Sequence, residues 1–179
     1  MTDEARNILV VAHGRRPDTV GAAARVIGAL RDAGATPVLS SDDRAELDSA
    51  IPGPLATLGA DVAVADIELA IVLGGDGTIL RAAELVREGS APVLGINMGH
   101  VGFLAEIERD DMDEAVRRVI DRDYTVEERL ALQVRIKDRD EQVIYETWAL
   151  NEATVEKASR ERMLEVVIEI DGRPLSSFG

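Results

Sequence analysis

The sequence predicts an α/β protein, in which a Rossmann-like parallel α/β domain is followed by the start of an antiparallel β-sheet domain. Short apolar runs alternate with helical patterns through residues 1–124, which indicates a parallel sheet covered on both faces. From residue 125 the pattern changes to period-two strands and tight turns, which is typical of antiparallel sheets. We therefore expect two domains, over residues 1–124 and 125–179.

Apolar runs predict the strands of the first domain, and the segment 41–60, rich in Asp, Pro and Gly, predicts a loop with at most a short helix. The expected strands are 8–12, 36–40, 61–66, 69–73 and 92–97.

Helical periodicity predicts three helices between these strands. The first covers residues 18–34 and ends at Gly34. Thr78 is the expected N-cap of the second helix, and Asp111 with Glu114 resembles a capping box at the start of the third. The buried face of the second helix is expected to contain Ile79, Leu80, Ala83 and Val86.

The second domain is predicted from alternating strands. Residues 129–137 alternate apolar and polar side chains and predict a half-buried strand, and residues 142–150 predict its partner. A further strand ends at Asp171-Gly172, a strong hairpin turn. Nothing in the sequence covers the apolar face of these strands, so we expect association or aggregation through it.

Composition excludes several classes of function. The chain has 20 basic and 34 acidic residues, for a net charge of −14, which argues against nucleic acid or an anionic membrane as the main partner. The absence of cysteine excludes disulfides, Cys-ligated zinc and thiol catalysis. The N-terminus has no signal-peptide pattern, and no run approaches the ~18 apolar residues of a membrane span, so a cytoplasmic protein is expected.

The stretch "GGDGT" (residues 74–78) is the candidate ligand-binding and catalytic loop. It lies between an expected strand and an expected helix, where glycines allow close backbone approach and the helix N-terminus favours phosphate. No lysine follows, so the loop is not a P-loop. Asp76 would be costly beside phosphates unless it bound a metal ion or took a proton from an attacking hydroxyl. From the residue types alone, an ordinary turn remains an equal alternative.

Three stretches together resemble the NAD kinase family: "LGGDGTILRAA" (73–83), "PVLGINMGHVGFLAEI" (92–107) and "ALNEATVEK" (149–157). The first alone is less specific, because similar strings occur in lipid kinases and phosphofructokinases. The resemblance implies phosphoryl transfer from ATP or polyphosphate to the adenosine ribose 2′-hydroxyl of NAD, giving NADP. It also implies Mg²⁺ or another divalent ion that arrives with ATP, and a homo-oligomer.

By this resemblance, Asp76 is the general base, and Gly75, Gly77 and Thr78 lie against the nucleotide. Arg81 would offer its guanidinium to a phosphate; alternatively, it is an exposed arginine paired with Glu84 or Glu88.

The resemblance also assigns residues outside this loop. Asn151 and Glu152 would hold adenine and the ribose hydroxyls of the dinucleotide, unless they form a turn cap. Arg162, or Arg160 in its place, would contact the ligand. Phe103 is expected near the adenine pocket, with core packing as the alternative.

Gly14 and Arg15, in "AHGRR" after the first strand, are candidates for the phosphate-donor site, with a solvated loop as the alternative.

Members of this family continue beyond the point where this sequence stops. We therefore expect an N-terminal portion or truncated product with little or no kinase activity by itself. The other hypotheses are a GGDGT-type kinase acting on a lipid or sugar, and a non-catalytic nucleotide-binding or oligomerisation module.

Overall fold

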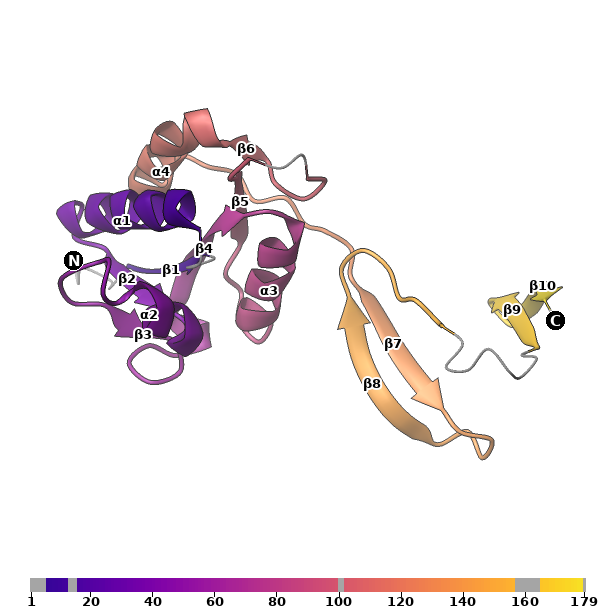
Figure 1. The fold of residues 1–179 in the computed structure, drawn as a ribbon. Helices are drawn as coiled ribbons and strands as arrows, with labels where there is room; N and C mark the ends of the chain where they lie inside the picture. Colours follow the sequence, from indigo (N-terminus) through magenta and orange to yellow (C-terminus); the bar gives the residue numbers. More distant parts are fainter. Residues whose placement is uncertain (1–5, 13–15, 100–101, 157–164, 179) are drawn as a thin grey trace. The chain divides into compact units, whose positions relative to one another are not determined.

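The chain folds into two compact units, Met1–Glu127 and Glu128–Gly179 (Figure 1). They are called here the α/β unit and the hairpin unit. The structure is a computed structural model that describes residues 6–12, 16–99, 102–156 and 165–178.

A parallel sheet forms the centre of the α/β unit. Its described strands lie in the order β3-β2-β1-β4-β5-β6, and every pair is parallel. The strand order reverses between β1 and β4, which is the point where ligands bind in open sheets of this class. The strands are β1 (Asn7–Ala12), β2 (Thr36–Leu39), β3 (Ala56–Thr57), β4 (Ile67–Gly74), β5 (Val93–Asn97) and β6 (Ile107–Glu108).

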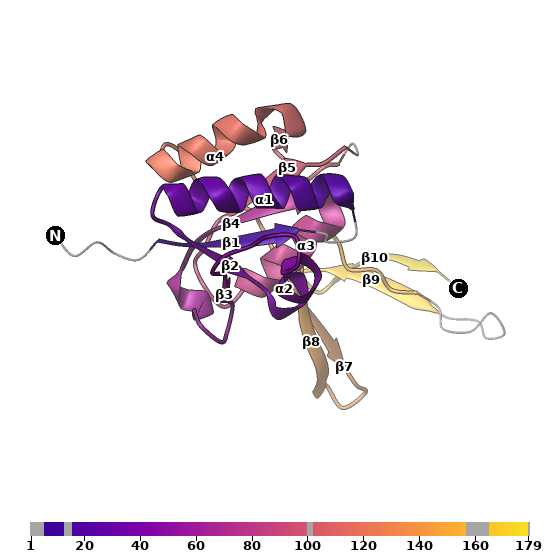
Figure 2. The same cartoon turned by 60° about the vertical axis from the view of Figure 1, so that its left-hand side comes forward.

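Helices cover both faces of this sheet, as the alternating pattern predicts (Figure 2). Helices α1 and α4 pack with the buried strand residues of one face of the sheet. Helix α3 packs with those of the opposite face. The helices are α1 (Pro17–Asp32), α2 (Ser41–Leu47), α3 (Asp76–Val86) and α4 (Met112–Asp121), with the short 3-10 helices η1 (Val64–Asp66) and η2 (Arg109–Asp111). Gly34 has a φ of 78° just after α1, as expected for a residue that ends a helix.

Two local predictions in this unit are wrong. Residues 61–66 form a single bridge, between Leu58 and Val62, and then η1. The Thr57 carbonyl accepts the N–H groups of residues 60–62 in a tight turn, so these donors do not extend a ladder. At the start of α4, the Asp111 side chain caps no backbone N–H among the described residues, and Glu114 instead binds Arg117 and Arg118.

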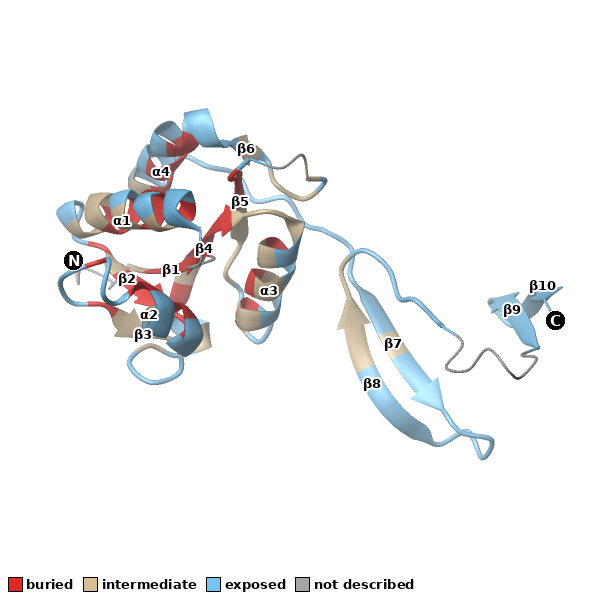
Figure 3. Cartoon of the chain, viewed as in Figure 1, coloured by how far each residue is buried: buried red, intermediate tan, exposed pale blue. Residues whose placement is uncertain are grey.

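The hairpin unit contains two antiparallel pairs, β7 (Leu132–Lys137) with β8 (Val143–Ala149) and β9 (Val166–Ile170) with β10 (Arg173–Phe178). Asp171 and Gly172 join the second pair with φ values of 51° and 70°, which confirms the predicted hairpin turn. The expected half-buried strand is wrong for β7, because Val134 alone of its residues is partly buried and the others are exposed (Figure 3).

In the part of the chain that the structure describes, none of the helices has the length and apolar character needed to cross a membrane.

Candidate functional site

The candidate site lies at the carboxyl edge of the parallel sheet. Three central strands end at the same level there. Ala12 of β1 pairs with Leu73 of β4, and Gly74 of β4 pairs with Asn97 of β5. A cleft of about 950 Å³ opens at this edge. It is lined by Ala12, Arg16, Thr19, Asp42, Asp43, Ala45, Glu46, residues 74–78 and Arg81. The sequence motif and the cleft therefore coincide at the point where the strand order reverses.

Asp76 is the first residue of α3, and Gly75 is its N-cap. The Asp76 carboxylate accepts the backbone N–H of Phe103 at 3.1 Å with both oxygens, and Oδ1 also accepts the N–H of Leu104 at 3.1 Å. The loop after β5 thus fixes the orientation of this carboxylate. Such orientation by neighbouring groups is a requirement for a general base.

Gly102 permits this contact. A Cβ atom at this position would lie 2.6 Å from Oδ1 of Asp76, which is closer than real contacts allow. A side chain at position 102 would therefore force the loop or the Asp76 carboxylate to shift from this contact. The same loop contains Gly99, whose φ of 116° favours glycine.

The prediction of Thr78 as an N-cap is wrong, since α3 begins at Asp76. Thr78 lies within the first turn, and its N–H binds the Gly75 carbonyl at 2.9 Å. Its side chain packs against Gly74, where any Cβ atom would collide with it. The helix begins three residues earlier than an N-cap at Thr78 would place it. Its buried residues are Ile79, Ala82 and Val86, whereas Leu80 is exposed and Ala83 is partly buried, so the predicted buried face is wrong for Leu80 and Ala83.

Arg81 contacts two other elements at the cleft. Its Nη2 donates to Oδ1 of Asp43 at 2.7 Å and to the carbonyl of Ala12 at 3.2 Å. The expected alternative, a pair with Glu84 or Glu88, is not the contact that forms. The positive charge of Arg81 is instead held inside the cleft lining.

Asp43 is nearly inaccessible to solvent, with 1% of its surface exposed. Ser40, the N-cap of α2, accepts the Asp43 N–H at 3.1 Å and donates its hydroxyl to Oδ2 at 2.9 Å. Burial raises the pKa of the Asp43 carboxyl, and the hydrogen bond from Arg81 acts in the opposite direction. The ionised form of this buried carboxyl is therefore stabilised by its hydrogen bonds from Arg81 and Ser40.

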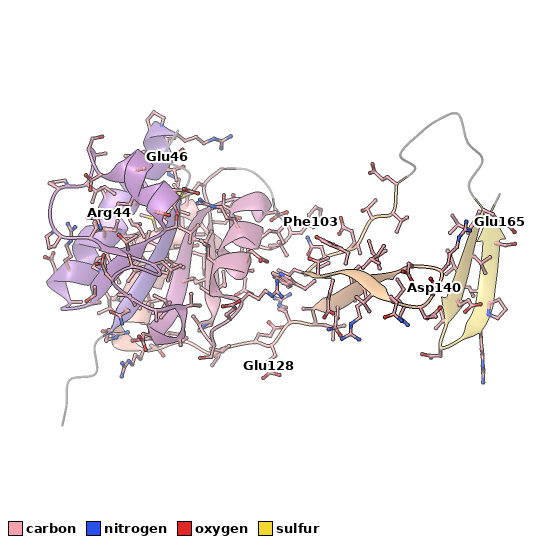
Figure 4. The ribbon with its side chains drawn as sticks, turned by 90° about the horizontal axis from the view of Figure 1, so that it is seen from below. Arg44, Glu46, Phe103, Glu128, Asp140 and Glu165 are labelled. Carbon is pink, nitrogen blue, oxygen red and sulfur yellow. The ribbon has the colours of Figure 1, made fainter. Side chains whose placement is uncertain are left out.

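Phe103 is 94% exposed at the edge of the α/β unit (Figure 4), so it does not pack in the core. An exposed phenylalanine whose backbone is fixed by Asp76 is available to contact a flat ligand. Its position near an adenine pocket remains a prediction.

The other predicted residues belong to the hairpin unit or lie outside the described residues. Asn151 and Glu152 are exposed, follow β8 and belong to the hairpin unit. Gly14, Arg15, Arg160 and Arg162 lie outside the described residues.

Sequence reasoning missed Ser40, Asp43 and Gly102. The pattern Ser-x-x-Asp before a helix is a capping signal, and it was present at positions 40 and 43. No local signal, however, links Asp43 to Arg81, because the two are 38 positions apart. Gly102 was inside a recognised motif, but its contact with Asp76 arises only from the fold.

The described residues contain no group of three or more His, Asp or Glu side chains placed to hold a metal ion.

Comparisons with known proteins agree with the motifs. Residues 55–124 match the family model "ATP-NAD kinase N-terminal domain". The chain is 61% identical to the NAD kinase of Leifsonia xyli over 97% of its own length and 58% of the relative. It is 50% identical to the NAD kinase of Thermobifida fusca, covering 97% of the chain and 55% of the relative. For NAD kinase 2 of Streptomyces coelicolor the identity is 45%, over 99% of the chain and 58% of the relative.

A solved structure shares the fold. The yeast NADH kinase complexed with NADH matches 98% of this chain and 55% of its own, with a TM-score of 0.76 at 21% identity. The chain thus spans 55% to 58% of the length of these curated relatives. With identity of 45% or more across nearly the whole chain to three NAD kinases, and a match of residues 55–124 to the family's N-terminal domain model, the chain resembles the NAD kinase family.

Proposed function

We propose that this chain provides the catalytic cleft of an enzyme that phosphorylates the adenosine ribose 2′-hydroxyl of NAD. The Asp76 carboxylate carries the proposal, because it is oriented by two backbone N–H groups at the edge of a cleft lined by residues 74–78. Two relatives that are 61% and 50% identical to this chain are named NAD kinases.

In the proposed reaction, Asp76 accepts the proton of the 2′-hydroxyl. The oxygen then forms a bond to the terminal phosphorus of ATP or polyphosphate. The bond from that phosphorus to its bridging oxygen breaks, and the leaving group is ADP or a polyphosphate shortened by one unit. A bound divalent ion would neutralise part of the phosphate charge.

Other residues of the chain bind and orient the substrates in this proposal. The backbone of residues 74–78 and the N-terminus of α3 accommodate phosphate. Arg81 adds a fixed positive charge, and Phe103 offers a flat apolar surface to adenine. Asn151 and Glu152 contact adenine and the ribose hydroxyls in this proposal.

Replacement of Asp76 by asparagine tests the proposal. The remaining Oδ1 can still accept the N–H groups of Phe103 and Leu104, so the loop is retained while the base is lost. In the protein at its native length, we expect kcat for NADP formation to fall by about 10²–10⁴-fold, with little change in the KM for NAD. The matched control is Asp32→Asn, which removes an exposed carboxylate at the end of α1.

The assay should supply NAD with ATP or polyphosphate in separate reactions, and a lipid or sugar acceptor in others. An unchanged rate for Asp76→Asn would remove Asp76 from the chemistry. Phosphorylation of a lipid or sugar in place of NAD would overturn the proposed substrate.

A further inference from the structure

Three separate elements meet at the guanidinium of Arg81. It extends from α3, one turn after Asp76, and reaches the end of β1 through the Ala12 carbonyl and the start of α2 through Asp43. Ser40, at the N-cap of α2, fixes the second oxygen of Asp43. The arginine that lines the cleft is therefore held in place by groups from outside its own helix.

This anchorage uses one of the three nitrogens of Arg81. Both contacts are made by Nη2, and among the described residues neither Nε nor Nη1 has an acceptor. A guanidinium carries five N–H donors in a rigid, planar fork that suits phosphate. The arginine thus combines a fixed position with donors that remain available in the cleft.

Stability does not explain why the chain buries Asp43. Burial is the largest influence on its pKa and raises it, despite the opposing contacts from Arg81 and Ser40. A carboxyl whose folded-state pKa is above its unfolded value holds its proton more tightly when folded, so ionisation at neutral pH works against folding. The buried carboxylate is therefore better explained by what it does to Arg81.

We propose that Asp43 is a positioning residue for phosphate binding, which holds the guanidinium of Arg81 beside residues 74–78 so that its remaining N–H groups bind a phosphate chain. The ligand class is a linear polyanion of phosphates, such as the donor triphosphate or the dinucleotide pyrophosphate. The assignment of either as a substrate rests on the proposed function, whereas the binding of phosphate by this pair does not.

Binding of inorganic tripolyphosphate, measured by calorimetry on the protein at its native length, tests the proposal without turnover. We expect Asp43→Ala to weaken binding about tenfold, the loss typical of one charged hydrogen bond. Asp48→Ala is the matched control, because it removes an exposed carboxylate at the other end of α2. Equal affinity for Asp43→Ala and Asp48→Ala would overturn the proposal.

A double-mutant cycle separates positioning from a direct role. If Asp43 acts through Arg81, then Asp43→Ala combined with Arg81→Ala should bind tripolyphosphate no more weakly than Arg81→Ala alone. Losses that multiply would overturn the proposal. Asp43→Leu, which keeps a similar volume but removes the acceptor for Arg81, provides a second variant if Asp43→Ala does not fold, and the same non-additivity is expected for it.

Steady-state kinetics of the same variants identify the phosphate that is bound. A raised KM for ATP with an unchanged KM for NAD assigns the pair to the donor, and the reverse assigns it to the dinucleotide. If the wild-type protein forms no NADP but Asp43→Ala still weakens tripolyphosphate binding, the proposed function fails and the role of Asp43 stands. If NADP forms and Asp43→Ala leaves both KM values and tripolyphosphate binding unchanged, the role of Asp43 fails alone.

Discussion

The two units of the chain differ in how far they bury their apolar side chains. In the α/β unit, β1 and β4 are enclosed between helices, and Leu9 and Ile71 are fully buried. In the hairpin unit, all of β9 is exposed, and Ile168 retains 41% of its surface (Figure 3). Both units contain strands with apolar side chains, but only the first covers both faces of a sheet.

This difference shows what a strand pattern does and does not specify. Period-two alternation determines which side chains share a face. Burial requires a second layer, because a hairpin pair has too little area to enclose its own apolar face. In the α/β unit that layer is formed by helices between consecutive strands.

The largest contrast is expected for the same substitution in the two units. Ile71→Ala should lower the free energy of unfolding of the α/β unit by about 2–5 kcal/mol, because it leaves a cavity in an enclosed core. Ile168→Ala should cost less than about 1 kcal/mol. Urea unfolding should be followed by far-UV circular dichroism, since every described helix lies in the α/β unit.

Fluorescence of the single tryptophan, Trp148 in β8, reports the hairpin unit in the same titration. A cost for Ile168→Ala equal to that of Ile71→Ala would contradict the contrast and indicate that the hairpin face is covered in solution.

A second contrast compares two glycines that are required for different reasons. Gly102→Ala should place a methyl group against Oδ1 of Asp76 and break the contacts to Phe103 and Leu104. Loss of these charge-assisted hydrogen bonds should cost about 1–3 kcal/mol and reduce NADP formation by at least tenfold.

Gly172→Ala is the matched substitution, because this glycine has a φ of 70° with open space around it. It should cost about 1 kcal/mol through backbone strain alone and leave the rate unchanged. Equal activity of the two variants would show that the approach of the loop to Asp76 is dispensable.

The smallest effect is expected for ion pairs. Glu68 binds Arg6 at 2.6 Å, and Arg6 also donates to the carbonyls of Val119 and Ile120 at the end of α4. The hydrogen bond from Arg6 lowers the pKa of Glu68 below 4.5. Glu68→Gln should cost about 1 kcal/mol at pH 7, whereas Glu146→Gln in the exposed pair with Arg135 should cost about 0.5 kcal/mol or less.

The pH dependence of this effect has a definite sign. A depressed folded-state pKa contributes stability above the unfolded value, and that contribution is lost as the pH falls through the folded-state pKa. Urea midpoints of wild type and Glu68→Gln should therefore differ at pH 7 and converge in acid below pH 4.5. A constant difference down to full protonation would contradict this assignment.

Much of the fold was predictable because it depends on local patterns. Apolar runs identified β1, β2, β4 and β5, and Gly34 and Asp171-Gly172 marked a helix end and a hairpin. Some predictions failed because of other local contacts, as at residues 61–66 and at the start of α4, and one failed at a tertiary contact. Thr78 is a good N-cap by type, but helix α3 begins at Asp76, where the loop after β5 contacts the carboxylate.

The sequence by itself determined the alternation of strands and helices, the position of the glycine loop and the resemblance to the NAD kinase family, because each is read from short stretches of neighbouring residues. Only the tertiary structure decided that Arg81 is paired with Asp43, that Gly102 must be small and that the apolar face of β9 is exposed. These depend on which distant segments come into contact, and that is set by the packing of layers, on which a local pattern carries no information.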